Sequence, residues 1–192
     1  MIKLNPEEQQ KVKQANITFD EFLKVNALWS KFIEKNKPAT SEELKELRQI
    51  NKGLNALIDN MSTSAPNLLD ILSNHSNELD VAFKEIISGQ ELNSEQREQL
   101  ISLVDRRGNG SFKNFALNSL EQVIKEISQE IKLLNEELND LEKGKTIQPS
   151  KLRKEFTCGV YASMVAGGLV SLNPVGFGLA VAAVGAAILD GC

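Results

Sequence analysis

Few side chains in this sequence have the type and spacing that catalysis or metal binding requires. The chain has one histidine, His75, and two cysteines, Cys158 and Cys192. His75 has no cysteine or carboxylate partner at metal-ligand spacing, so we interpret it as structural. The sequence also lacks a nucleophile-elbow glycine pattern, a phosphate-cradling loop and a cysteine–histidine pair at a recognisable spacing. We therefore predict no enzyme activity, no metal ion and no cofactor.

One turn rich in glycine and asparagine resembles two known motifs. Asp105, Asn109 and Gly110 fall at positions 1, 5 and 6 of a helix-loop-helix calcium site. Arg107 occupies a ligand position, however, and Ala116 stands where the closing glutamate is required. An Arg-Gly pair followed by Phe-x-x-Phe is similar to a stretch of caspase-recruitment death-fold domains. Both resemblances are short, and we favour a plain turn between two helices.

The C-terminal part of the chain is apolar and rich in glycine and alanine. From Phe156 to Leu189 it carries no charged residue. A transmembrane helix needs about 20 such residues, so one span fits and two full spans do not. Asn173 and Pro174 lie near the middle of this run, and Asn-Pro favours a turn because proline cannot donate the backbone hydrogen bond of a continuous helix. The sequence therefore predicts a helical hairpin that turns at these two residues.

The two cysteines flank the predicted hairpin. Cys158 precedes Pro174 by 16 residues and Cys192 follows it by 18, so a turn there brings both cysteines to the same end. A disulfide at that end would close the hairpin, although it could not persist in a normally reducing cytosol. The alternative is a pair of free thiols.

Small side chains recur every four residues along both predicted arms. Such strips let two helix backbones approach closely, which favours helix pairing in lipid. The first strip consists of Gly159, Ser163, Gly167 and Ser171, and the second consists of Gly178, Ala182 and Ala186. We expect them to form the contact between the arms.

The first 150 residues have a different composition. All 22 lysines and arginines of the chain lie at or before Lys154, against 26 acidic residues in total, which gives a net charge of −4. Because no basic cluster is present, we predict no nucleic-acid surface. The N-terminus lacks the apolar core of a signal peptide. We expect a membrane-associated protein, or one exported by a dedicated route after synthesis in the cytoplasm.

Helix signals dominate this region. Asn5 followed by Pro6 predicts the start of a first helix, and capping-box spacings predict further starts at Thr18 and Thr40. We expect a break at 62–66, where a proline follows several hydroxyl residues, and another helix from about 67 to 88.

The longest regular pattern is a heptad seam. Its members alternate three and four residues apart and are Leu117, Leu120, Ile124, Ile127, Ile131, Leu134, Leu138 and Leu141. Such a helix needs a partner helix. We favour the apolar stripe at 44–61 of the same chain, and the alternative is self-association or another helical protein bound through Leu117–Leu141.

The fold class that follows is all-α. We predict a soluble amphipathic helical domain over 1–150, with a long coiled-coil-type helix in a bundle, and an apolar helical hairpin over 151–192. In outline the chain resembles colicin-like pore-forming domains, in which amphipathic helices surround a hydrophobic hairpin. It is also similar to bacteriocin precursors with a polar leader and a small, glycine-rich, cysteine-closed toxin.

These resemblances imply a function at a lipid bilayer. We expect a membrane-active antimicrobial toxin, or its precursor, whose tail inserts into the bilayer and forms a pore. The alternative is a membrane-anchored adaptor or scaffold without toxic activity, which binds a protein partner through its heptad seam.

Overall fold

The structure is a computed structural model that describes residues 2–171 and 173–192. Within these residues all regular structure is helical and no strand occurs, so the all-α prediction is confirmed. In chain order the helices are α1 (Pro6–Glu34), α2 (Ser41–Asn74), α3 (Ser76–Ser88), α4 (Ser94–Gly108), α5 (Phe112–Glu142), α6 (Lys151–Ser171) and α7 (Pro174–Leu189).

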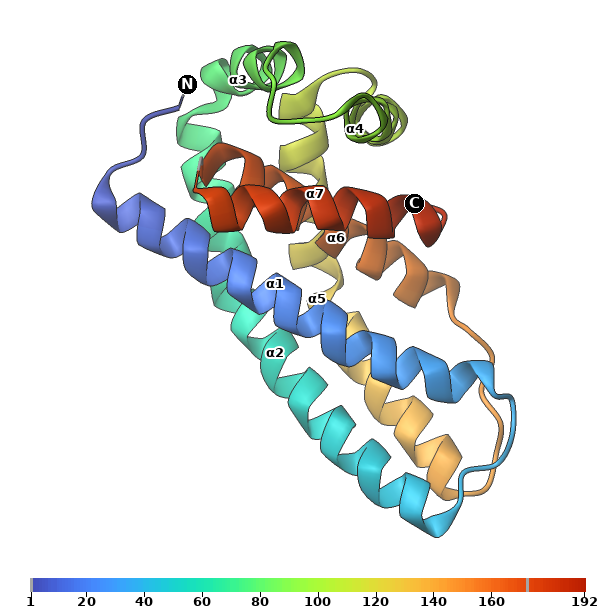
Figure 1. Cartoon of the computed structure of the whole chain (residues 1–192). Coiled ribbons are helices and arrows are strands. Elements are labelled where there is room, and N and C mark those ends of the chain that lie inside the picture. The colour runs from blue at the N-terminus through green and yellow to red at the C-terminus, as the bar shows by residue number, and fades with distance from the viewer. Residues whose placement is uncertain (1, 172) are drawn as a thin grey trace.

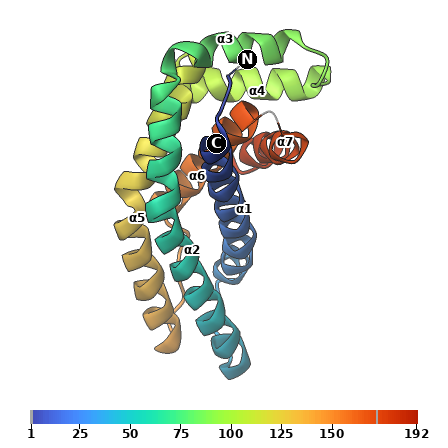
Figure 2. The same ribbon diagram turned by 90° about the vertical axis from the view of Figure 1, so that its left-hand side faces the viewer.

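The long helices α1, α2 and α5 form the body of the bundle, and the short helices α3 and α4 cover one end of it (Figure 1). Seen after a quarter turn, α2 and α5 lie side by side while α7 lies below the α3–α4 layer (Figure 2). α6 packs against α1 and α5, and α7 packs against α6 and α4. The predicted domain boundary at residue 150 falls directly before α6, and α6 is packed into the body of the bundle.

The helix starts at Asn5 and Thr40 are confirmed. The Asn5 side chain accepts a hydrogen bond from the backbone N–H of Glu8, and the Glu8 side chain accepts one from the Asn5 N–H. Thr40 and Glu43 form the same reciprocal pair. Each pair satisfies N–H groups that the first helical turn leaves without partners.

Two predicted helix boundaries are wrong. Thr18 does not begin a helix, because α1 is continuous and the Thr18 hydroxyl donates to the Gln14 carbonyl one turn earlier. The predicted break at 62–66 is also absent, and α2 passes through Pro66. A proline inside a helix costs about 3 kcal/mol. Burial of Met61 and Leu68 on either side of it offsets this cost.

The predicted seam lies on α5, where half of its members are buried. The buried members are Leu120, Ile127, Leu134 and Leu141. The other members, Leu117, Ile124, Ile131 and Leu138, are only partly buried. α2 packs along this helix, and the Asn51 amide donates to the Leu134 carbonyl at 3.1 Å. The helix α2, which contains the apolar stripe at 44–61, therefore packs against the seam.

Candidate functional site: the C-terminal hairpin

α6 forms the inner arm of the hairpin, and the part of it within the hairpin is largely buried. From Cys158 to Val170 only Tyr161 is partly exposed. On the side of α1, the Phe156 ring packs edge-on against Phe22, with 5.5 Å between ring centroids. The apolar sequence of α6 is thus matched by an apolar environment inside the bundle.

α7 forms the outer arm, and its outer face is apolar. Val175 is 71% exposed and Leu189 is 89% exposed, and no residue of α7 carries a charge. A helix on the surface of a globular protein normally presents charged and polar side chains outward. α7 departs from that pattern over its full length.

The turn between the arms forms around Asn173 and Pro174, as the sequence indicated. The Asn173 side chain accepts a hydrogen bond from the Val175 N–H at 2.9 Å and so caps the start of α7. Pro174 occupies the first position of that helix, where the missing N–H costs nothing. At the end of α6, the Ser171 hydroxyl donates to the Gly168 carbonyl.

The open end of the hairpin is closed by the two cysteines. Cys158 and Cys192 lie at disulfide distance, with their Cα atoms 5.6 Å apart, and they join positions 34 residues apart in sequence. Beside them the Tyr161 hydroxyl donates to the Asp190 carboxylate at 2.8 Å. Burial of the phenol, together with this hydrogen bond, raises the pKa of Tyr161. Two cross-links, one covalent and one polar, thus tie the end of α7 to α6.

The small residues are placed differently from our expectation. A Cβ added to Gly159 would contact Val123 on α5, and one added to Gly167 would overlap Asn16 on α1. Gly178 has nothing within 4 Å of an added Cβ, and Ala182 is exposed. In the first strip, Gly159 and Gly167 thus face the bundle and Ser163 is buried, whereas Ser171 at the turn lies against Gly176 of α7. The second strip, which ends at Ala186, lies on the outer side of α7.

Other small residues make the contact between the two arms. An added Cβ at Gly168 would lie 2.7 Å from the Ala180 Cβ and would overlap the Gly176 carbonyl. On α7 the buried residues are Gly176, Ala180, Ala183, Val184 and Ala187. The expected contact differs from the observed one because a four-residue spacing defines a helix face but does not specify which neighbouring helix packs on that face.

A buried charged cluster lies where α6 begins. The Arg153 guanidinium pairs with two glutamates of α5, Glu130 through Nε at 2.9 Å and Glu137 through Nη2. The Trp29 indole N–H donates to the Glu137 carboxylate at 3.3 Å, and the guanidinium carbon lies 5.9 Å from the Trp29 ring centroid. One buried cation is thus paired with two buried carboxylates. Desolvation of these carboxylates raises the pKa of both Glu130 and Glu137.

A pattern in the sequence indicates this cluster, but it lies outside the heptad seam. Glu130 and Glu137 continue, at seven-residue spacing, the buried row that begins with Ala116 and Val123. Acidic residues at two successive positions of a buried row require a cation from another helix. Arg153, which stands at the boundary where charge disappears from the sequence, supplies it.

The raised pKa values give the cluster a pH dependence of known sign. The ordinary pKa of glutamate is 4.5. Above this pH, Glu130 and Glu137 bind protons more strongly in the folded protein than in the unfolded chain. The two carboxyls therefore favour folding more strongly as pH falls from 7 toward 4.5, and this contribution is lost as pH rises through their raised pKa values. The Glu126 carboxylate, which faces Glu130, adds to this direction.

Glu137→Gln should reduce this pH dependence without loss of stability at pH 7, because a neutral amide leaves Arg153 paired one to one with Glu130. Urea unfolding at pH 5, 6 and 7 measures it. Glu136→Gln is the matched control, since Glu136 lies on the exposed side of α5 and pairs with Lys132 at 3.9 Å. Equal pH slopes for the two variants would contradict the assignment.

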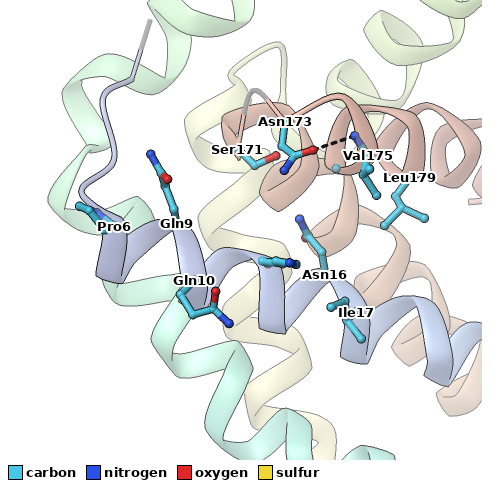
Figure 3. Close-up of a pocket in the computed structure, with 11 residues that line it drawn as sticks. Pro6, Gln9, Gln10, Asn16, Ile17, Ser171, Asn173, Val175 and Leu179 are labelled. Carbon is cyan, nitrogen blue, oxygen red and sulfur yellow. Dashed lines mark hydrogen bonds between the residues drawn. The ribbon is translucent and has the colours of Figure 1, made fainter.

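The turn of the hairpin borders a cleft of about 420 Å³ against the first turns of α1. Figure 3 shows Gln9 and Asn16 of α1 extending toward the turn, where Ser171 and Asn173 lie. Gln10 also lines the cleft. Lys13 also lines this cleft. On the other side of the turn, a second cleft of about 590 Å³ is lined mainly by apolar residues of α3, α6 and α7. The tip of the hairpin is therefore less tightly enclosed than its middle.

The remaining candidates from the sequence have structural roles. His75 ends α2, and its Nε2 atom lies 3.0 Å from the Glu8 carboxylate, which ties the start of α1 to the α2–α3 junction. Asn109, in the left-handed region with φ of 51°, ends α4, and Gly110 follows with φ of 79°. In the part of the chain that the structure describes, no group of three or more histidine, cysteine, aspartate or glutamate side chains is placed to hold a metal ion.

Among the described helices, none has both the length and the apolar character that crossing a membrane requires. Comparisons of the chain with protein-family models, with curated proteins and with solved structures give no match.

Proposed function

We propose that this protein is membrane-active, of the toxin or bacteriocin type, and that its C-terminal hairpin enters a lipid bilayer. The observation that carries the proposal is the outer face of α7, which has no charged residue and exposes Val175 and Leu189. Contiguous apolar surface on a folded protein marks a site of interaction with another apolar phase or surface.

The packing of the hairpin supports this proposal. Its inner arm, α6, is covered by α1 and α5, so the body of the bundle stores a segment that is too apolar to be exposed by itself. Its outer arm, α7, has its strongest contacts with α6. A hairpin that is closed by Cys158 and Cys192 moves as one unit, so α7 meets the bilayer first and α6 follows it.

Burial of the heptad seam favours a membrane-active protein over a membrane-anchored adaptor. An adaptor would need the seam on α5 for a partner, but its members Leu120, Ile127 and Leu134 are buried within the chain. The two most exposed large apolar side chains of the described residues, Val175 and Leu189, lie on α7 instead.

Val175→Asp should weaken binding to phosphatidylcholine vesicles by at least about tenfold, because a charged side chain within the apolar layer costs about 2.5–3.5 kcal/mol. Vesicle co-sedimentation measures binding, and release of an entrapped dye measures activity. The matched control is Val81→Asp on α3. Val81 is also an exposed valine, at 56%, but it is outside the hairpin.

The control variant should bind within about twofold of the parent protein, since its substitution does not enter the bilayer. Parent protein that neither binds vesicles nor releases dye would contradict the proposed function. Equal losses in the two valine variants would show that binding does not use the face of α7.

A further inference from the structure

A cleft of about 450 Å³ lies beside the link that closes the hairpin. Its walls come from α1, from residues 149–150 before α6, from α6 itself and from the residues that follow α7. Both Cys158 and Cys192 line this cleft. Pockets that hold small molecules begin at about 300 Å³, so a small organic molecule fits next to the bond between the two sulfur atoms.

The two cysteines differ in access from this cleft. Cys158 is only 6% exposed and belongs to the part of α6 that packs into the bundle. Cys192 is partly exposed, and its backbone N–H donates to the Ala187 carbonyl at the end of α7. A thiolate that opens a disulfide must reach one of the two sulfur atoms, and its rate depends on that access. Access therefore selects Cys192.

A cation lies near both cysteines. Lys154 lines the cleft and precedes Cys158 by four residues, so both side chains are on one face of α6. The Lys154 Nζ atom lies 3.3 Å from the position that an added Cβ on Gly191 would occupy, one residue before Cys192. A nearby ammonium group favours a thiolate over a thiol. Lys154 therefore stabilises the negative charge that sulfur carries during thiol–disulfide exchange.

The other charges of the cleft do not oppose this role. Two carboxylates line it, Glu34 from the last turn of α1 and Asp190, which accepts the hydrogen bond of Tyr161. Lys31 and Lys154 line it as well and balance these two carboxylates. An approaching thiolate therefore meets no net negative charge from these four side chains.

We propose that Cys192 is a site of reversible modification by a low-molecular-weight thiol, which enters this cleft and exchanges with the bond between Cys158 and Cys192. The entering thiolate forms a new bond to the Cys192 sulfur. The bond between the two cysteines breaks, and its electron pair leaves on the Cys158 sulfur, which takes up a proton from water. One disulfide replaces another, so this step needs no further oxidant or reductant.

The exchange frees the outer arm of the hairpin and leaves the inner arm in place. Cys192 then carries the small thiol, and the hydrogen bond from Tyr161 to Asp190 still joins α6 to the end of α7. α6 keeps its packing against α1 and α5. The modification thus acts on α7 alone. It does not rest on the proposed membrane activity, because the exchange takes place in solution.

The first experiment treats the oxidised full-length protein with reduced glutathione at neutral pH. Acid stops the exchange at intervals, peptic digestion at low pH preserves the adducts, and mass spectrometry locates them. We expect adducts on Cys192 to exceed those on Cys158 by about tenfold or more, because access decides which sulfur is attacked. Equal adducts on the two cysteines, or a bond that opens only when the protein unfolds, would overturn the proposal.

The second experiment measures access without competition from closure of the original bond. Cys158→Ser leaves Cys192 as the single cysteine, and Cys192→Ser leaves Cys158. With glutathione disulfide, the Cys192 thiol should react about tenfold faster or more than the Cys158 thiol in the folded variants. In concentrated urea the two rates should agree within about twofold, because neither side chain is buried there. Equal rates in the folded variants would contradict selection of Cys192 by access.

Lys154→Gln should slow the reaction of the oxidised protein with reduced glutathione about threefold, because the leaving thiolate loses a nearby cation. Lys151→Gln is the matched control and should react within about 1.5-fold of the parent protein, since Lys151 is exposed on the same helix but does not line the cleft. Equal rates for the two lysine variants would contradict the role of Lys154. These experiments contain no lipid, so their failure is distinct from failure of vesicle binding.

Discussion

Arg153→Met is expected to lower the free energy of unfolding at pH 7 by about 3–5 kcal/mol, the cost of leaving buried charge without its partner. Arg153 is 6% exposed and is the cation that faces both Glu130 and Glu137. Without it, two carboxylates remain close together in a region that excludes water. Urea unfolding followed by the fluorescence of Trp29, which lies against the cluster, measures the loss.

Arg48→Met is the matched control. Arg48 also pairs through Nε with a glutamate, Glu142, at 2.9 Å, but its side chain is 53% exposed. We expect a loss below about 1 kcal/mol, because solvent weakens an exposed pair. If Arg153→Met fails to fold, the triple change with Glu130→Gln and Glu137→Gln should restore a folded protein, since a neutral cluster needs no cation. Similar losses in the two arginine variants would contradict a buried network.

Reduction of the bond between Cys158 and Cys192 is expected to lower the free energy of unfolding by about 3–4 kcal/mol, because the bond closes a loop of 34 residues and restricts the unfolded chain. Unfolding curves with and without a thiol reductant measure the difference. The paired change Cys158→Ala and Cys192→Ala should match the reduced parent and should not respond to reductant. A parent protein whose unfolding curve is the same in both conditions would show that the bond does not form.

Local sequence signals predicted several elements of this fold. The helix starts at Asn5 and Thr40 follow from local capping chemistry, and the hairpin turn at Asn173 and Pro174 follows from a backbone donor that proline lacks. These features depend on neighbours in sequence. The continuity of α2 through Pro66 does not, because burial against other helices decides whether the cost of the proline is offset.

The candidate site was only partly predictable for the same reason. The spacing of Cys158 and Cys192 about a central turn placed them together. The row that contains Glu130 and Glu137 lies outside the heptad seam, and its burial depends on an arginine that approaches from another helix. The strips that begin at Gly159 and Gly178 were identified as surfaces, but the sequence does not specify which neighbouring helix each surface meets.

The link between Cys158 and Cys192 also determines how the chain carries mechanical load. Tension applied between the two ends of the polypeptide passes from Cys192 through the sulfur atoms directly to Cys158. α7 and the part of α6 beyond Cys158 then carry none of it. At about 3.3–3.6 Å per extended residue, the bypassed loop holds roughly 110–120 Å of chain. A pulling experiment should record a contour length shorter by this amount until the bond is reduced.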